Sequence, residues 1–435
     1  MRQENIVLVG GGLAGAHAAA ELRKRGFDGP LTLLSEEGDR PYDHVPLSKE
    51  YLHGGHGYHS LFIHDEDFYA ERRIDLRLNA HVSRVDPHSD AVHLDSGERI
   101  PYSAALLATG AAARRLPLPG ATGATPLGGV HHLRTLGEAD RLRSELEPAR
   151  RVVVIGAGLL GCEITASAAA RGKDVALVSR GALPLASALG TEMATVYRDL
   201  HTEHGVRILA PAEAAELRGS GSVDEVVLTD GRTVPADLVV IAVGAIPRTG
   251  LAEATGLAVD DGIITDSALA TSAPRLYAAG DVASVRYPRT GRHERRDHFA
   301  TARTQGKAAA RSMLGEQVSY DEVPFFFSDQ YDVWMEYTGA VLPGAELVVH
   351  GDLDSRRFVA FWVRGGQLTA AMNMGLKDVP DAVTPLIHGG ERVSDRDLRR
   401  IVADARPAGG DFGASLAGRS STGGHPGEHA GERCP

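Results

Sequence analysis

The feature that most constrains the fold is a pattern that occurs twice: an apolar run, a glycine motif, a segment of helical composition and a second apolar run. The first copy places GGGLAG at 10–15 after the run 6–9. The second places GAGLLG at 156–161 after the run 152–155. Such glycines let the backbone approach a pyrophosphate at a helix N-terminus, although they also allow close packing of a helix on a strand. Two complete units favour two dinucleotide-binding domains.

Polar residues follow the second apolar run of each unit. The run 31–34 is followed by Ser35 and Glu36, and a carboxylate at that strand end can accept hydrogen bonds from an adenosine ribose. The run 175–178 is followed by Ser179 and Arg180 instead. We therefore expect Glu36 to bind the ribose of the first dinucleotide.

Size and charge exclude several classes of protein. A chain of 435 residues predicts two or three domains. With 43% hydrophobic and 24% charged residues, the composition is typical of a globular protein. The 46 basic and 57 acidic residues give a net charge of −11, which argues against nucleic-acid or anionic-membrane binding.

Apolar runs and cysteines indicate the compartment. The longest near-candidate for a membrane span, 152–164, contains glycines and Glu163, so we expect no span. The first apolar run begins directly after MRQEN, which leaves no room for a signal peptide. Cys162 and Cys434 form no paired motif, and His425 and His429 flank a proline and a glycine. We expect a cytoplasmic, disulfide-free protein without a metal site.

Three further segments complete an ordered set: LLATG at 106–110, VVIAVG at 239–244 and LYAAGDVA at 276–283. Together with the glycine motifs, they resemble the two-dinucleotide-binding flavoprotein reductases. The resemblance implies FAD in the first unit and NAD(P)H in the inserted second unit, with Asp281 hydrogen-bonded to the ribityl chain of the flavin. The chain lacks the redox cysteine pair of the disulfide reductases. Asp43 and His44 stand near the position where peroxidases and oxidases of the group carry a single cysteine.

The stretch RPYDHVPLSKEYL at 40–52 identifies the branch. It is similar to the PYDRPPLSK segment of the ferredoxin reductases that serve oxygenases, a group related to apoptosis-inducing factor. The resemblance implies a stiff loop over the isoalloxazine, with Lys49 beside the ring and paired with Glu163. A buried cation there favours the reduced, anionic flavin. Lys49 and Glu163 are the candidate catalytic residues.

Segments of the C-terminal half extend this resemblance. HFATARTQG at 298–306 is similar to HWxxAxxQG, which implies a helix start that stabilises negative charge at the pyrimidine edge of the flavin. PFFFSDQYD at 324–332 resembles FFWSDQYD, which lies against the flavin, and LHTEHGV at 200–206 and AMN at 371–373 also match. The chain departs from the branch at His44 and Val45, which replace an arginine and a proline, and at Phe327, which replaces a tryptophan.

Nicotinamide preference is the sharpest departure. NADH enzymes of the branch carry glutamate where Ser179 stands, and that carboxylate repels a 2′-phosphate. Arg180 can bind phosphate, whereas Gly161 keeps the third glycine typical of NADH enzymes. We expect a preference for NADPH or the use of both nucleotides. The alternative is that Ser179 and Arg180 are solvated residues without a role.

The matches imply the following cofactor-binding residues. For FAD they are Gly10, Gly12, Leu13, Ala14, Gly15, Glu36, Lys49, Thr109, Gly110, Gly280, Asp281, His298, Phe299, Ala300 and Phe327. For the nicotinamide nucleotide they are Gly156, Gly158, Leu159, Leu160, Gly161, Ser179, Arg180 and Gly244.

The expected fold class is α/β, with two Rossmann-like dinucleotide-binding domains and a C-terminal α+β domain. We predict an FAD-binding domain at 1–115 and 246–320, an NAD(P)H-binding domain at 116–245 and a C-terminal domain at 321–405. Residues 406–435 are rich in Gly, Ser and Pro and predict a disordered tail.

The function implied is transfer of electrons from NAD(P)H through FAD to a ferredoxin that serves a P450 or a ring-hydroxylating oxygenase, by a monomer or homodimer. The alternatives are an NAD(P)H oxidase or quinone reductase, and a redox-sensing flavoprotein interaction module. Ferredoxins are usually acidic, so a local basic patch is expected to attract one. The candidate patch consists of Arg286, Arg289, Arg292, His293, Arg295 and Arg296, and a solvated hairpin is the alternative.

Overall fold

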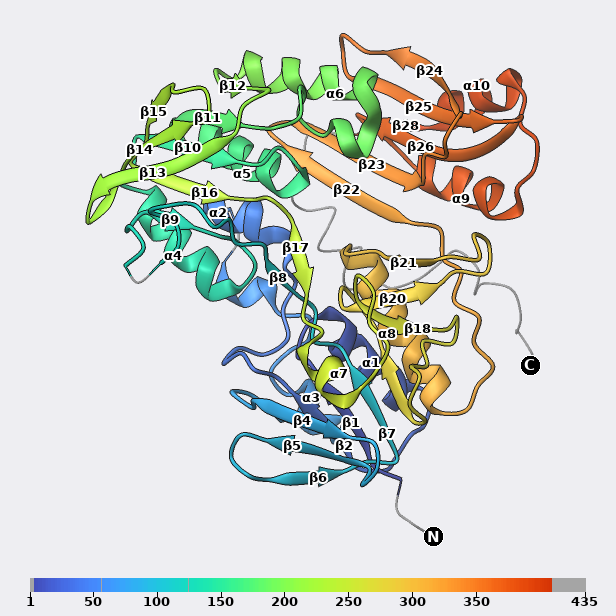
Figure 1. Ribbon diagram of the computed structural model, residues 1–435. Coiled ribbons are helices and arrows are strands. Elements are labelled where there is room, and N and C mark those ends of the chain that lie inside the picture. Colours follow the sequence, from blue (N-terminus) through green and yellow to red (C-terminus); the bar gives the residue numbers. More distant parts are fainter. Residues whose placement is uncertain (1–3, 56, 124, 409–435) are drawn as a thin grey trace.

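The computed structural model describes residues 4–55, 57–123 and 125–408, and three five-stranded sheets dominate it (Figure 1). Two sheets are parallel, and the third, near the C-terminus, is antiparallel. This arrangement confirms the predicted α/β class with two Rossmann-like units and a C-terminal α+β part.

The first parallel sheet has the strand order β19-β7-β1-β2-β3. Its inner strands are continuously apolar because both faces of the sheet are covered, and every residue of β1, β2 and β7 is buried. The elements of this part are β1 (Ile6–Val9), α1 (Leu13–Lys24), β2 (Leu31–Leu34), α3 (Phe68–Glu71), β3 (Asp75–Arg77), β4 (Val82–Asp86), β5 (Ala91–Leu94), β6 (Arg99–Pro101), β7 (Ala104–Leu107), β8 (Ala111–Ala113), β17 (Ala245–Pro247), α7 (Gly250–Thr255), β18 (Ile263–Thr265), β19 (Leu276–Ala278), β20 (Ala283–Arg286), β21 (His293–Arg295) and α8 (Phe299–Met313).

The second parallel sheet repeats this order as β12-β11-β10-β16-β9. The elements of this part are β9 (Val130–His131), α4 (Leu136–Leu146), β10 (Arg151–Ile155), α5 (Leu159–Ala170), β11 (Asp174–Val178), α6 (Ala186–Glu203), β12 (Arg207–Leu209), β13 (Ala214–Ser220), β14 (Ser222–Leu228), β15 (Thr233–Pro235) and β16 (Leu238–Ile241). The antiparallel pair formed by β8 and β17 carries both connections between the two parallel sheets.

The C-terminal part is an antiparallel sheet with two helices. Its elements are β22 (Phe325–Gln330), β23 (Val333–Gly339), β24 (Glu346–Asp352), β25 (Arg357–Arg364), β26 (Gln367–Met374), β27 (Leu376–Lys377), α9 (Val379–Gly389), α10 (Asp395–Asp404) and β28 (Arg406–Pro407). Arg406 and Pro407, which composition placed in the tail, pair with Lys377 and Leu376. The start of the predicted tail is therefore wrong by at least these two residues, and its remainder from 409 lies outside the described residues.

The segment 40–52 differs from the stiff loop that was expected there. It forms the short helices η1 (Val45–Ser48) and α2 (Glu50–His53), and η2 (Tyr58–Leu61) follows. Pro46 lies in the first turn of η1, where its missing N–H is not needed. The apolar side chains of the segment belong to a core shared with α4, α5 and the antiparallel sheet, to which Leu47, Tyr51 and Leu52 contribute. The segment therefore joins the three parts of the molecule.

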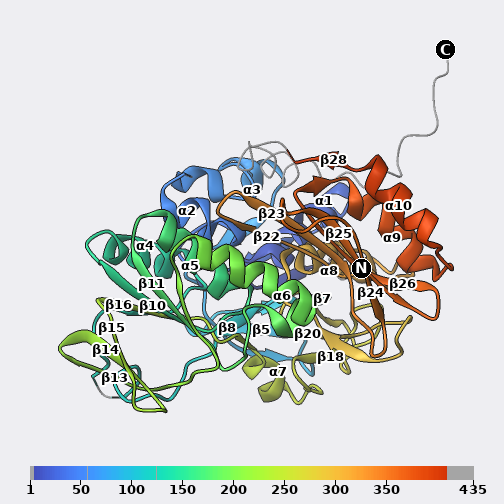
Figure 2. The same ribbon diagram turned by 90° about the horizontal axis from the view of Figure 1, so that it is seen from above.

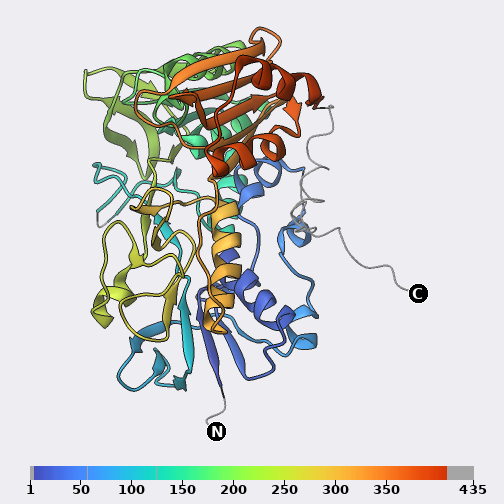
Figure 3. The ribbon, with the colours of Figure 1, turned by 90° about the vertical axis from the view of Figure 1, so that its right-hand side faces the viewer.

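Two helices connect distant parts. In Figure 3, α8 stands upright in the middle of the molecule below the C-terminal part. It crosses α1 so closely that a Cβ on Gly306 would collide with the carbonyl oxygen of Ala14. Seen from above in Figure 2, α6 lies beside the antiparallel sheet, where His201 Nδ1 and Tyr331 Oη are 2.9 Å apart.

Candidate functional site

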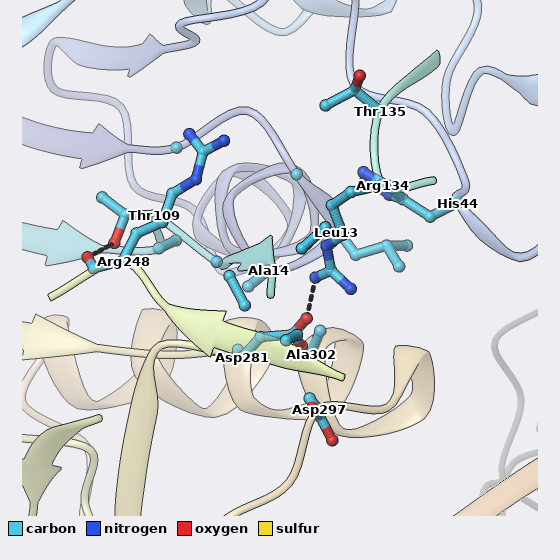
Figure 4. A pocket seen from close by; sticks show the side chains of 18 of the residues that line it. Leu13, Ala14, His44, Thr109, Arg134, Thr135, Arg248, Asp281, Asp297 and Ala302 are labelled. Atoms are coloured by element: carbon cyan, nitrogen blue, oxygen red, sulfur yellow. Dashed lines mark hydrogen bonds and ion pairs between the residues drawn. The ribbon is translucent and has the colours of Figure 1, made fainter. Parts of the chain in front are cut away.

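A pocket of about 700 Å³ lies where all three parts meet (Figure 4). It receives both glycine motifs, the ends of β7 and β19, the segment before α2 and the start of α8. The predicted residues that line it are Gly10, Gly12, Leu13, Ala14, Glu36, Lys49, Thr109, Gly110, Gly158, Leu159, Leu160, Glu163, Gly244, Gly280, Asp281, His298, Phe299 and Phe327. Tertiary structure thus brings most of the predicted site together.

The outer glycines of the motifs serve packing. A Cβ on Gly10 would collide with the Ala108 carbonyl oxygen, and one on Gly15 would collide with the Gly10 carbonyl oxygen. The second motif repeats both contacts, because Gly156 meets Ala242 and Gly161 meets Gly156 in the same way. Gly15, Gly156 and Gly161 do not line the pocket, so they hold each helix against its sheet.

The middle glycines have a different environment. A Cβ on Gly12 or Gly158 would have no neighbour within 4 Å, and both residues line the pocket. Each stands at the N-cap of its helix, α1 or α5, where unpaired backbone N–H groups favour an anion. The pocket therefore contains two cradles of the kind that holds a pyrophosphate.

Lys49 and Glu163 form a buried ion pair, with 2.8 Å between Nζ and Oε2 and side chains that are each 7% exposed. Glu163 also accepts hydrogen bonds from the hydroxyls of Ser48 at 2.7 Å and Ser328 at 2.9 Å. The Lys49 amine lies 5.4 Å from the centre of the Phe327 ring. The expected pairing is thus present, and it fixes a positive charge at the pocket wall.

Asp281 follows β19 and is paired with Arg134, which extends across the pocket in Figure 4. Arg134 was missed from the sequence. It directly precedes Thr135, the N-cap of α4, whose hydroxyl accepts from the backbone of Glu138 in a capping box. The available signal was an arginine beside a Thr-x-x-Glu sequence after a short strand.

Glu36 lies at the opposite end of the pocket. Its carboxylate accepts from Arg248 Nη1 at 2.6 Å, and His81 Nδ1 is 3.6 Å away. Arg248 also accepts a hydrogen bond from the Thr109 hydroxyl through its backbone oxygen, at 2.9 Å. No local signal marked Arg248, because the chain brings it to Glu36 over a separation of 212 positions.

Two histidines at the pocket are held neutral. Burial lowers the pKa of His44 to about 3, and the charge of Arg134 acts in the same direction. Burial also lowers the pKa of His298, the N-cap of α8, whose ring stacks on Phe326 at 4.9 Å. The start of α8 therefore presents its partial positive charge to the pocket without a charged imidazole.

Phe327 occupies the position where a tryptophan was expected. Its ring stacks on Trp334 with 5.1 Å between centroids and 16° between planes. Phe327 lines the pocket, whereas Trp334 does not.

Besides Gly15, Gly156 and Gly161, three predicted residues do not line the pocket: Ser179, Arg180 and Ala300. The Arg180 side chain is 81% exposed, and its Nη1 is 4.0 Å from Glu213 Oε1. Glu213 lies well beyond the end of β11 in the sequence, and no motif points to it.

The proposed basic patch is largely neutralised. Arg289 faces Asp321, Arg295 contacts Asp261 and Asp297, and Arg296 is paired with Glu294. The side chains of Arg295 and Arg296 are only 12% exposed. The exposed positive charges of this segment that have no acidic partner among the described residues are Arg286 and Arg292.

Within residues 4–55, 57–123 and 125–408, no group of three or more His, Cys, Asp or Glu residues is placed to hold a metal ion, and no helix is long and apolar enough to cross a membrane. Cys162 is buried and free. The tail residues His425, His429 and Cys434 lie outside the described residues.

Comparison with known proteins shows two family matches. Residues 4–306 match the pyridine nucleotide-disulphide oxidoreductase family, and residues 325–407 match the reductase C-terminal family. Rhodocoxin reductase of Rhodococcus erythropolis is 37% identical over 92% of this chain and 94% of its own length. The ferredoxin–NAD(+) reductase component of the anthranilate 1,2-dioxygenase system of Burkholderia cepacia is 34% identical over 92% and 97%.

Solved structures agree. The putidaredoxin reductase in a covalent complex with putidaredoxin has a TM-score of 0.87 and 31% identity, over 92% of this chain and 98% of that one. The ferredoxin reductase of the CYP199A2 system from Rhodopseudomonas palustris has a TM-score of 0.82 and 34% identity, over 85% and 91%.

Proposed function

The chain belongs to the ferredoxin reductases of the pyridine nucleotide-disulphide oxidoreductase family, and from this premise we propose that it passes electrons from NAD(P)H through FAD to a ferredoxin serving a P450 or a ring-hydroxylating oxygenase. The observation that carries the proposal is the buried pair of Lys49 and Glu163 in a pocket that contains both glycine cradles. The one described cysteine, Cys162, is buried and unpaired, so the pocket offers no dithiol to accept electrons.

The residues present fit FAD. The cradle at Gly12 is open, the carboxylates of Asp281 and Glu36 line the pocket at the ends of β19 and β2, and Arg134 adds a cation that suits a pyrophosphate. Bound flavin would supply the chemistry that converts a two-electron donor into single electrons for an iron-sulfur protein. Gly158 and Leu159 offer the second cradle to the nicotinamide nucleotide.

The protein's own contribution is positioning and electrostatics. The hydroxyls of Ser48 and Ser328 hold the Glu163 carboxylate in one orientation, and the carboxylate holds the Lys49 amine in turn. The amine and the start of α8 both place positive potential at the pocket wall, which stabilises negative charge that develops there. Neutral His44 and His298 add no competing charge.

We propose that the end of β11 determines nicotinamide preference. Arg180 is exposed and free to bind a 2′-phosphate, whereas Glu213 beside it opposes one. The expected result is use of NADPH with residual use of NADH. Ser179→Glu should shift the ratio of kcat/KM values toward NADH by about tenfold or more, because one repelled or lost charged contact is worth about 1.4 kcal/mol or more. An unchanged ratio would show that this position has no role.

We propose three domains: an FAD-binding domain at 1–115 and 246–320, an NAD(P)H-binding domain at 116–245, and a C-terminal domain at 321–405. The division is supported by the β8–β17 pair, which carries both connections between the parallel sheets.

The test of the function is steady-state kinetics with NADH and NADPH against a panel of ferredoxins, oxygen and quinones. We expect kcat/KM to be highest for a ferredoxin. Faster turnover with oxygen or a quinone would assign an oxidase or quinone reductase. Slow turnover with every acceptor, together with a change in oligomeric state, would assign a redox-sensing protein.

A further inference from the structure

A second cavity, of about 850 Å³, lies on the other side of Lys49. Its walls come from α2, α5, the turn between β22 and β23 and the start of β25, with Glu50, Ser167 and Asp329 among its polar lining. Among the described residues, only Lys49 lines both this cavity and the flavin pocket. Lys49 therefore borders both spaces.

The wall of this cavity is shaped by two sequence segments that do not line the flavin pocket. Tyr331, in the wall, adopts a φ of 58°, which is unfavourable for a bulky side chain. Its hydroxyl lies 2.9 Å from His201 Nδ1, and its ring stacks on His204 at 3.6 Å. The LHTEHGV and SDQYD segments thus meet at the second cavity and hold its wall in one conformation.

The charges around Lys49 are unbalanced. Its single ammonium is paired with Glu163, and its charge also acts on the carboxyls of Asp43 and Asp329, which both feel the like charge of Glu50. Removing uncompensated negative charge from water is costly. Glu163 accepts hydrogen bonds from two hydroxyls, whereas no described residue donates one to the Asp329 side chain. Burial, with Glu50 as the next cause, raises the pKa of Asp329 to about 7. Asp329, which lines the second cavity, is therefore suited to gain and lose a proton near neutral pH.

The inference rests on the proposed function. Oxidation of one NAD(P)H by two one-electron ferredoxins yields NAD(P)⁺, two reduced ferredoxins and one proton, and that proton must reach water. We propose that Lys49 and Asp329 form the exit path for this proton, from the flavin pocket to the second cavity. Lys49 and Asp329 both line the second cavity, so the Lys49 ammonium passes a proton through water in that cavity to the Asp329 carboxylate. The amine regains a proton from the pocket side, and Asp329 releases its proton to bulk water.

Other charged groups near this path are fixed or exposed. Glu163 accepts hydrogen bonds from Ser48 and Ser328 and is paired with Lys49, so it holds the Lys49 amine in place. The remaining titratable and charged groups that line the cavity are Glu50 and His53 on α2, Tyr331 and Asp332 in the turn after β22, and Arg356 and Arg357 at the start of β25. Arg356 is paired with Glu203, and Asp332 is exposed.

The experiment uses FAD-loaded enzyme, reduced with NADPH and mixed with excess oxidised [2Fe–2S] ferredoxin in a stopped-flow instrument with a pH-indicator dye. Asp329→Asn should slow proton release by about tenfold or more, a modest value beside the roughly 10²–10⁴-fold that positioned acid–base groups contribute. The matched control is Asp332→Asn, which removes an exposed carboxyl from the same cavity. It should release protons like the wild type.

Two further measurements separate proton transfer from a structural role. Infrared titration of the wild type, without turnover, should show a protonated carboxyl band that disappears near pH 7 and is absent from Asp329→Asn. Glu50→Gln should move that titration to lower pH, because it removes a like charge. Fast proton release by Asp329→Asn, an equal defect in Asp332→Asn or a band that survives in Asp329→Asn would overturn the proton path. Those results leave ferredoxin reduction intact, whereas a wild type that reduces no ferredoxin overturns the proposed function and this path with it.

Discussion

Replacing Glu163 with glutamine tests the central interaction of the site. The change keeps the shape of the side chain but removes its charge, so the Lys49 amine, 7% exposed, loses its 2.8 Å partner. Removing one partner of a buried ion pair costs about 3–5 kcal/mol. We expect about 3 kcal/mol, at the low end of that range, because the carboxyls of Asp43 and Asp329 still interact electrostatically with the amine. One of the two hydroxyls that donate to Glu163 also loses its acceptor, because the amide nitrogen cannot accept.

The matched control is Glu98→Gln. Glu98 is paired with Arg77 at 2.7 Å, nearly the same distance, but its side chain is 49% exposed. Exposed pairs contribute about 0–1 kcal/mol, so this variant should lose less than about 1 kcal/mol. Both variants are measured by urea unfolding of the FAD-loaded protein, with flavin fluorescence as a second signal for release of the cofactor.

The double variant Lys49→Met with Glu163→Gln completes a cycle. Removing both charges leaves no buried amine without a partner, so the double variant should lose clearly less than the sum of the two single variants. The reasoning would be refuted by equal losses for Glu163→Gln and Glu98→Gln, or by additive losses in the cycle.

Three further predictions follow from particular contacts. Burial raises the pKa of Asp329 to about 7, above its value of about 3.9 in the unfolded chain. The stability that its proton contributes should therefore be lost as the pH rises from about 4 to 7. In urea unfolding measured across this range, the free energy of unfolding should fall with pH for the wild type but not for Asp329→Asn. Gly161→Ala places a Cβ against a backbone oxygen, so it should lower the midpoint of urea unfolding. Gly158→Ala has room for its Cβ and should fold normally, but that Cβ enters the pocket and should weaken NADPH binding. Titration calorimetry measures this second effect. Arg286→Glu with Arg292→Glu should raise the KM for ferredoxin several-fold and spare ferricyanide reduction, and equal effects on both acceptors would exclude docking there.

Much of the fold was predictable because its signals are local. Fully buried parallel strands are continuous apolar runs, so the runs 6–9, 31–34, 152–155 and 175–178 appear as strands in the structure. The glycine spacing is equally local, since a turn between a strand and a helix needs the same backbone freedom in both units. The opposite roles of outer and middle glycines, by contrast, depend on which of them meets a neighbouring backbone.

The site was predictable where a motif carried it, as with Lys49 and Glu163, and not where pairing across the fold creates it. Arg134 and Arg248 follow no recognised motif, and they enter the pocket by meeting Asp281 and Glu36 from distant segments. The arginine-rich segment failed as a simple patch for the same reason. Charge counted along the chain does not show that Arg295 and Arg296 turn toward acidic partners.

The sequence by itself determined the two nucleotide-binding units, their order and the lysine of the segment 40–52, because these depend on residues close together in the chain. Tertiary structure decided that this segment is helical and packs in a core with α4, α5 and the antiparallel sheet. It also decided that Asp329 is half-buried and lies within the electrostatic influence of Glu50 and Lys49. Burial and the distance between charges are properties of the folded chain, and they set which carboxyl keeps a proton.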